Sequence, residues 1–456
     1  MSANEEIELC DLFKRQVGLR KTKTALVDGD EEKTLTTSLP EIISDMYSAD
    51  LTRILKAIKS LRRMLTRESN PPIEKIIEAG LVRLLVTFLG CDHDGEPLLQ
   101  CEAAKALTTI AAGTSQQTSA VVQAGAVPQL IRLLVIPHVD IVHNCIWTLG
   151  NIIGDGAEHR DFVIENGVIT PLMRLVDMNA PPKFLRTVTW VILNLCHINY
   201  PPPKLEAINA CLSALRILIR HTDYDVLSDT CWALYYVIDG TRELIQQVVE
   251  SPDVLSRLVE LLGNQEPRVI IAALRTIGNF INVDDSLMQA VIDCKLLQML
   301  PAILQHPDVE IKELAFWVLS KITGGSSEHI QAVINCNLLP LVIEVLNTGE
   351  LKSQIQATWM IIRLTRRGTL EHIIYVVQCG ALKSLCDLLT TKEVTLLNVV
   401  LKGIFSVLEA TNKFGQVEYL YVVLKEIGGL DKIEKLQNHE DCDVGLKSYD
   451  IFHKFF

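Results

Sequence analysis

The sequence predicts an all-α fold made of stacked helical repeats. From Leu39 onward the apolar residues have helical spacing, and a pattern of two short apolar helices separated by a turn residue recurs along the chain. A longer third helix is predicted about 22 residues after each turn, and these third helices carry all five tryptophans. Three helices per unit and a period in the low forties are typical of an armadillo-repeat, right-handed superhelical solenoid, here of about ten repeats.

Composition agrees with a repeat array and argues against other classes. At 456 residues the chain is too long for one ordinary core, and 48% of it is hydrophobic, with a mean hydropathy of +0.25. No apolar run approaches the roughly 20 residues of a membrane helix, and the polar N-terminus predicts no signal peptide, so we expect an intracellular protein. The formal net charge of −12 argues against general nucleic-acid binding and favours basic partners.

The twelve cysteines are scattered and form no CxxC pair, so we expect neither a disulfide framework nor a metal site, and no cofactor. Cys294, Cys336 and Cys379 occupy one position of the repeat, where Ala79 and Ala124 stand in other units. A free cysteine packs as a small apolar residue, so we interpret these three as packing residues in a reducing compartment.

The first part of the chain differs from the rest. Residues 1–40 are polar and cannot bury enough apolar surface to order themselves, so we expect a flexible N-terminal segment. The solenoid is expected to occupy residues 41–456. Its first helix is indicated by i, i+4, i+7 spacing, and the pair Pro71–Pro72 ends it. The apolar residues of that helix are Ile54, Ile58, Leu61 and Leu65.

One turn position defines the repeat. Its residues are 42 to 48 positions apart, and glycine is frequent among them because it adopts a left-handed turn without steric cost. They are Gly80, Gly125, Gly167, Ala210, Asp253, Lys295, Asn337, Gly380 and Gly428.

Two positions of the third helix form columns along the solenoid. The first column contains Lys105, Trp147, Trp190, Trp232, Arg275, Trp317 and Trp359. Four residues later, on the same helix face, stand Thr109, Asn151, Asn194, Tyr236, Asn279, Lys321 and Arg363. A single tryptophan on a helix is usually core, but core packing does not require all five at one phase. The asparagines allow two interpretations: a structural ladder between units, or a binding surface.

The binding interpretation fits the chemistry of both columns. Parallel indoles make slots for lysine and arginine stems, with a cation–π attraction of about 0.5–2 kcal/mol each. A carboxamide has a donor and an acceptor, so it can hold the backbone of an extended peptide without selecting its side chains. Nearby acids would then select positive charge. These are Asp155, Asp229 and Asp239.

Several segments together resemble the importin-α family, from about residue 12 to the C-terminus. They are CEAAKALTTIAAGT, IWTLGNIIGDG, TWVILNLC, DTCWALYYVIDG, ALRTIGNF and GGLDKIEKLQNHED. The resemblance implies an armadillo solenoid that binds basic nuclear localisation signals at a major and a minor site and is found in cytoplasm and nucleus. It implies an exportin as a further partner at the C-terminal repeats, and neither a membrane nor nucleic acid as a partner.

The resemblance also implies roles for individual residues. Gly113, Thr118 and Asp155 would form the pocket for the key lysine. The rest of the major site would be Asn144, Trp147, Asn151, Trp190, Asn194, Asp229, Trp232 and Tyr236. The minor site would contain Arg275, Asn279, Trp317 and Trp359.

The chain departs from the family pattern at four of these column positions. Lys105 and Thr109 replace a tryptophan and an asparagine, and Lys321 and Arg363 replace two asparagines of the minor site. Because a cation repels a basic peptide and offers its backbone no acceptor, we expect a weakened minor site.

The N-terminus departs further. The family opens with a long arginine-rich segment that binds importin-β, whereas this chain begins almost at the motif LFKRQVGLR, residues 12–20. Within that motif, Lys14 and Arg15 would fold back into the major site and compete with cargo. We expect weak or absent importin-β binding.

Two function classes therefore remain open. The first is a nuclear import receptor or adaptor that binds basic localisation signals. The alternative is a non-transport armadillo scaffold or regulator that binds basic peptides without engaging importin-β. An enzyme is not expected, because the histidines are dispersed and no phosphate loop, metal spacing or nucleophile motif occurs.

Overall fold

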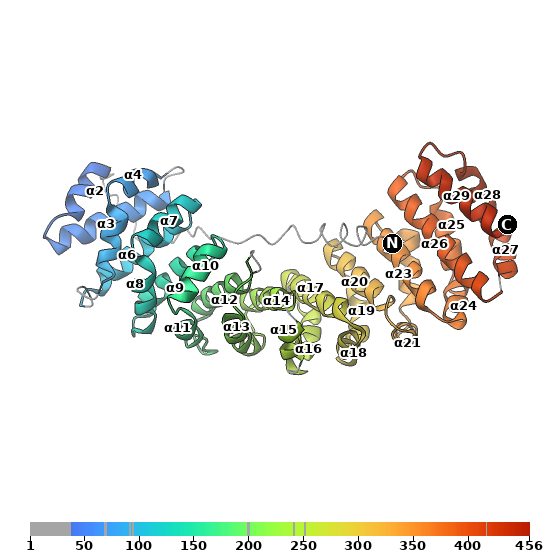
Figure 1. Cartoon of the computed structure of the whole chain (residues 1–456), viewed down its shortest axis with the longest axis horizontal. Helices are drawn as coiled ribbons and strands as arrows, with labels where there is room; N and C mark the ends of the chain where they lie inside the picture. The colour runs from blue at the N-terminus through green and yellow to red at the C-terminus, as the bar shows by residue number, and fades with distance from the viewer. Residues whose placement is uncertain are drawn as a thin grey trace. The chain divides into compact units, whose positions relative to one another are not determined.

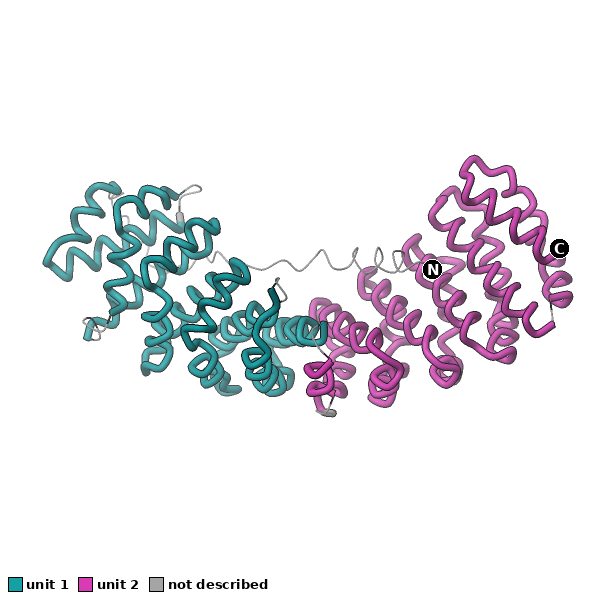
Figure 2. The backbone as a smooth tube through the Cα atoms, in the orientation of Figure 1, with its two compact units in different colours: residues 1–240 teal, residues 241–456 magenta. Residues whose placement is uncertain are grey.

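The prediction of an all-helical chain of stacked repeats is confirmed. The computed structural model describes residues 38–67, 71–90, 93, 95–197, 201–239, 242–249, 252–415 and 417–456, and every regular element within these ranges is a helix (Figure 1). The chain divides into two compact units, residues 1–240 and 241–456 (Figure 2).

Unit 1 contains five of the third helices in the described part of the chain. The third helices are α3 (Leu51–Arg67), α6 (Pro97–Ala111), α9 (Val139–Ile153), α12 (Pro182–Cys196) and α14 (Tyr224–Ile238). The shorter helices are α2 (Leu39–Met46), α4 (Ile73–Glu78), α5 (Leu81–Phe88), α7 (Ser115–Gln123), α8 (Ala126–Arg132), α10 (Ala157–Glu165), α11 (Ile169–Met173) and α13 (Leu205–Leu218).

Unit 2 also contains five third helices, again counted over the described ranges. They are α17 (Pro267–Val283), α20 (Val309–Ile322), α23 (Leu351–Arg367), α26 (Val394–Lys413) and α29 (Cys442–Phe455). The shorter helices are α15 (Arg242–Val249), α16 (Pro252–Glu260), α18 (Asp285–Asp293), α19 (Leu296–Leu304), α21 (Ser327–Asn335), α22 (Leu339–Thr348), α24 (Leu370–Gln378), α25 (Ala381–Leu388), α27 (Val417–Glu426) and α28 (Gly429–Leu436).

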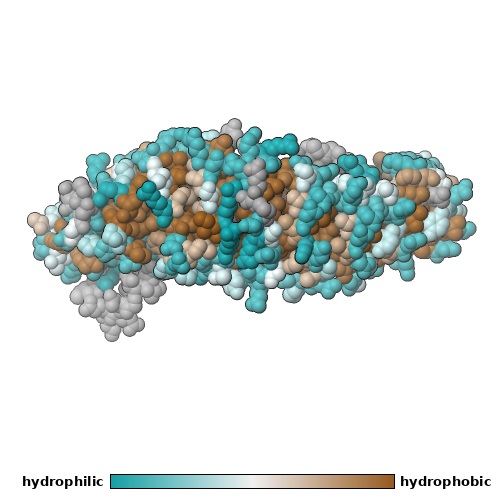
Figure 3. All heavy atoms as spheres, turned by 90° about the horizontal axis from the view of Figure 1, so that it is seen from below, coloured by the Kyte–Doolittle hydropathy of each residue, from teal (hydrophilic) through white to brown (hydrophobic). Residues whose placement is uncertain are grey.

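Consecutive third helices pack against one another within each unit. In unit 1, α3, α6, α9, α12 and α14 contact in that order, and in unit 2 the same holds for α17, α20, α23, α26 and α29. Most of the shorter helices pack against these third helices. Apolar side chains therefore lie between neighbouring repeats, and in the space-filling view they show between bands of polar residues (Figure 3).

The turn position has the expected left-handed backbone in seven of the nine repeats. Five of these are glycines, and the other two are Lys295, with φ of 69°, and Asn337, with φ of 53°. The assignment of Ala210 and Asp253 to this turn was wrong. Ala210 lies inside the continuous helix α13, which begins only after Pro201–Pro203, residues that have no N–H to donate to a helix. Asp253 is the second residue of α16, after Pro252.

Helix α26 corrects the expectation that no segment approaches a membrane span. By length and composition alone it is apolar enough to cross a membrane, and three bent helix pairs would be too if each were one span. However, 67% of its apolar window is buried inside the protein, where α26 packs against α23, α25 and α29. Its composition is therefore that of a third helix covered by neighbours on several sides.

Candidate functional site

Two tryptophans of unit 1 are nearly buried, and one of them, Trp190, lies against the preceding third helix. Trp147 and Trp190 are each 7% exposed. A Cβ at Gly150 would lie 2.3 Å from Cζ3 of Trp190, so only glycine lets this indole sit on α9. The ring centroid of His143 lies 5.7 Å from that of Trp147. These two indoles are therefore held by packing and expose little surface, which is less open than the slots expected from the sequence.

The asparagine column forms the structural ladder that was one of the two sequence interpretations. Asn151 Nδ2 donates to the carbonyl of Thr108 at 3.1 Å, and Asn194 Nδ2 donates to that of Gly150 at 3.2 Å. Both side chains are buried. Each carboxamide thus joins its third helix to the preceding one through its donor, and its use as a clamp for a peptide backbone stays a prediction.

The three residues assigned to the lysine pocket come from adjacent segments. Gly113 lies in the turn between α6 and α7, and a Cβ there would lie 1.8 Å from Oε1 of Gln117. Thr118 on α7 is fully buried, and its hydroxyl donates to the carbonyls of Ala111 at 3.0 Å and Thr114 at 3.1 Å. The threonine therefore holds the α6–α7 turn.

Asp155, just after α9, has partners that sequence reasoning missed. Ser115 Oγ donates to its Oδ1 at 2.9 Å, and His159 Nδ1 lies 2.8 Å from its Oδ2. The other ring nitrogen of His159 lies 3.3 Å from Ser119 Oγ. The Asp155 side chain is only 5% exposed, so these contacts hold the carboxylate firmly. An i, i+4 Asp–His pair at a helix start was the available signal for this contact.

The remaining residues of the predicted major site have local roles. Asn144 Nδ2 donates to the carbonyl of Asp140 at 2.7 Å within α9. On α14, the Trp232 ring lies 5.5 Å from that of Tyr235, and the Tyr236 ring lies 4.4 Å from that of His197. Asp229 is half-buried on the same helix.

Lys105 is less repulsive than the sequence suggested. Its ammonium lies 3.0 Å from Oε1 of Glu102, whose other oxygen accepts a hydrogen bond from Nε of Arg62 at 2.8 Å. Because Glu102 is buried between the two cations, it offsets part of the charge that Lys105 adds to this end of unit 1.

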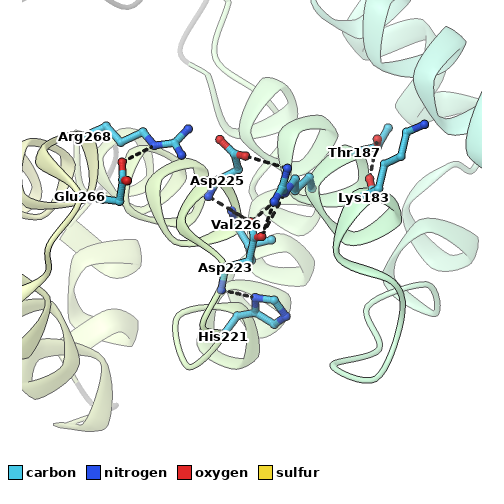
Figure 4. A network of polar contacts seen from close by, with 9 residues as sticks. Lys183, Thr187, His221, Asp223, Asp225, Val226, Glu266 and Arg268 are labelled. Atoms are coloured by element: carbon cyan, nitrogen blue, oxygen red, sulfur yellow. Dashed lines mark hydrogen bonds and ion pairs between the residues drawn. The ribbon is translucent and has the colours of Figure 1, made fainter. Parts of the chain in front are cut away.

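A network of ion pairs holds the start of α14 against α12 (Figure 4). Asp223 accepts hydrogen bonds from the backbone N–H groups of Asp225 and Val226 and thereby caps α14. Arg186 on α12 lies 2.6 Å from Asp223 and 3.2 Å from Asp225. Burial opposes ionisation of Asp223, but the hydrogen bonds from Arg186 and the backbone outweigh it and hold the pKa of this carboxyl below its usual value.

The predicted minor-site residues all lie in unit 2. Arg275 pairs with Glu310 at 3.1 Å. Trp317 packs over Gly278, where a Cβ would lie 1.9 Å from its Cζ3. Asn279 and Trp317 are both half-buried. Gly150 and Gly278, which admit the indoles of the next repeats, were missed in the sequence, although each directly precedes a column asparagine.

Trp359 and its neighbours in unit 2 differ from the tryptophan sites of unit 1. The ammonium of Lys402, from the next third helix, lies 5.8 Å from the centroid of the Trp359 ring. Arg363 Nη1 donates to the carbonyl of Ser320 at 3.4 Å, so this arginine joins third helices as Asn151 and Asn194 do in unit 1.

Two further sequence predictions concern other parts of the chain. Lys14 and Arg15, assigned to self-occupancy of the groove, lie outside the described residues. Cys294, Cys336 and Cys379 are free thiols, and they are half-buried at helix ends rather than fully buried. In the part of the chain that the structure covers, no group of three or more His, Cys, Asp or Glu side chains could hold a metal ion.

Comparison with known proteins identifies the repeats and the relatives. Residues 114–154, 156–197 and 288–324 match the armadillo/β-catenin-like repeat family, and residues 418–456 match the atypical Arm repeat. The crystal structure of an engineered protein has a similar fold, with a TM-score of 0.75 over 91% of this chain and 98% of that one, at 22% identity. The armadillo-repeat solenoid predicted from the period is thus confirmed.

The sequence is also similar to importin subunits over nearly its whole length. It is 39% identical to importin subunit alpha-1b of Oryza sativa subsp. japonica, over 92% of this chain and 79% of the relative. It is 38% identical to importin subunit alpha-3 of Arabidopsis thaliana, over 92% and 80%. It is 37% identical to importin subunit alpha-B of Dictyostelium discoideum, over 94% and 85%. The chain therefore belongs to the importin-α family.

Proposed function

We propose that the protein is a non-catalytic nuclear import adaptor that binds basic localisation-signal peptides along the third helices of unit 1. The observation that carries this proposal is the position of the Asp155 carboxylate, which follows α9 and its indole Trp147. An acid just beyond a helix that carries a column tryptophan suits an extended peptide rich in lysine or arginine. Function in such an adaptor implies movement between cytoplasm and nucleus.

The charge of the four third helices from α6 to α14 supports a basic ligand at this part of unit 1. Helices α6, α9, α12 and α14 together contain three Lys or Arg residues and four Asp or Glu residues. Asp155 adds a further negative charge just beyond α9. A basic peptide is therefore attracted to this face, as expected for a chain with a net charge of −12.

An orphan donor in the aromatic row also supports a peptide ligand. The indole Nε1 of Trp190 is buried and has no hydrogen-bond partner among the described residues. Buried donors of folded proteins are nearly always satisfied, and the carbonyl of a bound peptide would supply the missing acceptor. Contact with the peptide backbone at this point would add affinity without selecting a sequence.

Asp155→Lys tests the proposal most directly. We expect it to weaken binding of a monopartite lysine-rich peptide by at least the ~1.5–3 kcal/mol of a charge-assisted contact, because the substitution also adds repulsion. Isothermal calorimetry measures this loss. Glu158→Lys is the matched control, since Glu158 is exposed three residues away and its reversal changes the net charge equally. Equal losses in the two variants, or none in Asp155→Lys, would show that the peptide binds elsewhere.

A pull-down from cell extract distinguishes the adaptor from the non-transport scaffold. A transport adaptor should capture importin-β together with basic cargo, whereas a scaffold should capture basic proteins alone. Asp155→Lys serves as the reference in the same assay: in a transport adaptor it should lose the basic cargo and retain importin-β, and in a scaffold it should lose the basic proteins.

A further inference from the structure

Four third helices of unit 2 are strongly basic, unlike α6, α9, α12 and α14 of unit 1. Helices α17, α20, α23 and α26 contain ten Lys or Arg residues and only three Asp or Glu residues. Moreover, each of these three acids already has a basic partner within 4 Å. The pairs are Arg275–Glu310 at 3.1 Å, Lys352–Glu313 at 3.8 Å and Lys454–Glu409 at 3.0 Å. This face thus carries a net positive charge in an acidic protein.

Three cations lie on the third helix of Trp359 and on its two neighbours. Lys402 occupies the tryptophan position of the next repeat, 43 residues on, and its ammonium lies 5.8 Å from the Trp359 ring. Arg363, one turn after Trp359, extends to the carbonyl of Ser320 at 3.4 Å. Ser320 is followed directly by Lys321, so all three cations belong to adjacent third helices, α20, α23 and α26. We call Lys321, Arg363 and Lys402 the cationic cluster.

The aromatic ring in the middle of this cluster is already occupied. Trp359 is 7% exposed and packs with Ile362 and Val399, and the ammonium of Lys402 lies over its ring. A lysine from a peptide would have to displace Lys402 and approach two further cations. A carboxylate, by contrast, is attracted by the guanidinium of Arg363 and by the ammonium groups on the two neighbouring helices.

We infer that the cationic cluster of unit 2 is a binding site for acidic peptide segments. Two spacings between packed helices, about 8–10 Å each, separate α20 from α26, and an extended peptide advances about 3.3–3.6 Å per residue. The site therefore spans about five or six residues of an Asp/Glu-rich segment. This inference goes beyond the proposed function: it concerns the other unit and a ligand of opposite charge, and it holds whether or not unit 1 binds basic peptides.

Fluorescence anisotropy with three labelled peptides of about eight residues tests the inference. The peptides are Asp/Glu-rich, its Asn/Gln counterpart and its Lys/Arg counterpart. We expect the full-length protein to bind the acidic peptide about ten-fold or more tightly than the amide peptide at about 50 mM salt. Binding should weaken steeply toward about 500 mM salt, because exposed charges are screened. Equal affinity for the acidic and amide peptides would overturn the inference.

Two matched triple variants locate the site. Lys321→Gln, Arg363→Gln and Lys402→Gln together should weaken acidic-peptide binding about ten-fold or more. Lys383→Gln, Lys425→Gln and Lys435→Gln remove the same charge from exposed positions on α25, α27 and α28, and should change it less than about three-fold. Similar losses in the two variants, or no loss in the first, would refute the assignment. Circular dichroism checks that each variant folds. If the first triple variant does not fold, Lys402→Gln alone replaces it, with an expected loss of about three-fold in affinity for the acidic peptide.

Cross-titration separates this inference from the function proposed for unit 1. Asp155→Lys should leave acidic-peptide binding unchanged within about two-fold, because Asp155 lies in unit 1. Loss of acidic-peptide binding in Asp155→Lys would contradict a site in unit 2.

Discussion

At the scale of single residues, the position of each indole in the tryptophan column depends on the residue that it packs against. Gly150 admits the ring of Trp190 and Gly278 admits that of Trp317, since a Cβ at either position would lie within 2.3 Å of the indole. The residue that joins neighbouring third helices also varies. It is asparagine at 151 and 194 but arginine at 363, and all three donate to a backbone carbonyl of the preceding third helix. A neutral asparagine and a positively charged arginine therefore make the same link between third helices.

Gly150→Ala tests the contact between α9 and Trp190. Helix propensity alone would favour alanine by about 1 kcal/mol, whereas the new Cβ would collide with the indole at 2.3 Å. We expect a net loss of about 1–2 kcal/mol in the free energy of unfolding, measured by urea denaturation, together with a changed near-ultraviolet circular dichroism signal. Gly95→Ala is the control, because nothing lies within 4 Å of a Cβ there, and it should be neutral within ~0.5 kcal/mol. A stabilised Gly150→Ala would mean that the indole does not pack on α9.

At the scale of helices, side-chain caps and charged residues fix where each element begins. Asp223, Asp308 and Asp441 cap third helices α14, α20 and α29, each accepting backbone N–H groups of the first turn. Arg186 then joins the capped end of α14 to α12. Between α12 and α14 the described residues form one helix, α13, after Pro201–Pro203, where the intervals between the preceding third helices of unit 1 have two shorter helices each.

Asp223→Asn should reveal the charge contribution of this cap as a pH dependence. Because the folded-state pKa of Asp223 lies below its unfolded value, the stabilisation is present above about pH 4 and is lost as pH falls through the folded pKa. Asparagine keeps the capping acceptor, so we expect a loss of ~1 kcal/mol at pH about 7 that shrinks as the pH falls below about 4. Urea denaturation over this range measures it.

The control for that experiment is a cap elsewhere in the chain. Asp441→Asn makes the same substitution at the start of α29, where the side chain accepts the N–H of Val444 at 3.0 Å. It should show a weaker dependence on pH. If the loss at Asp223 were instead constant from pH about 7 to 3, the ion pair with Arg186 would contribute nothing.

At the scale of the whole molecule, α6, α9, α12 and α14 of unit 1 differ in charge from α17, α20, α23 and α26 of unit 2. The four helices of unit 1 carry four acidic and three basic residues, and the four helices of unit 2 carry three acidic and ten basic ones. Helix α3, at the start of unit 1, has six Lys or Arg residues and no acid. One chain thus presents two different electrostatic surfaces on the same type of scaffold. The four helices of unit 2 attract an acidic ligand and repel a basic one.

Bipartite basic peptides test this contrast in a single assay. We expect a second lysine cluster to improve affinity less than about three-fold, because unit 2 repels it. Lys321→Asn and Arg363→Asn together should increase that gain, since the substitutions remove two charges and supply two carboxamides. Calorimetry of matched monopartite and bipartite peptides gives the ratio. A gain of about a hundred-fold in the unmodified protein would contradict the charge argument.

Much of the candidate site followed from residue spacing, and its energetics did not. Spacing placed Trp147 and Asn151 on one face of α9. It also gave the tryptophan column, whose position in the repeat after Trp359 is occupied by Lys402. It could not show that Asn151 donates to the carbonyl of Thr108, or that His159 and Ser115 hold Asp155. These partners lie 4 to 43 residues away in the chain, and those from other helices become neighbours only when the repeats stack.

The sequence by itself determined the helical class, the period and the turns, because helix amphipathicity and left-handed turns depend on residues within a few positions of each other. It also determined the departures in charge at Lys321 and Arg363. Only the tertiary structure decided that α13 runs through Ala210, that Gly150 makes room for Trp190, and that Lys402 covers Trp359. Each of these depends on how closely two elements approach, and that distance is set by packing among all the neighbours at once.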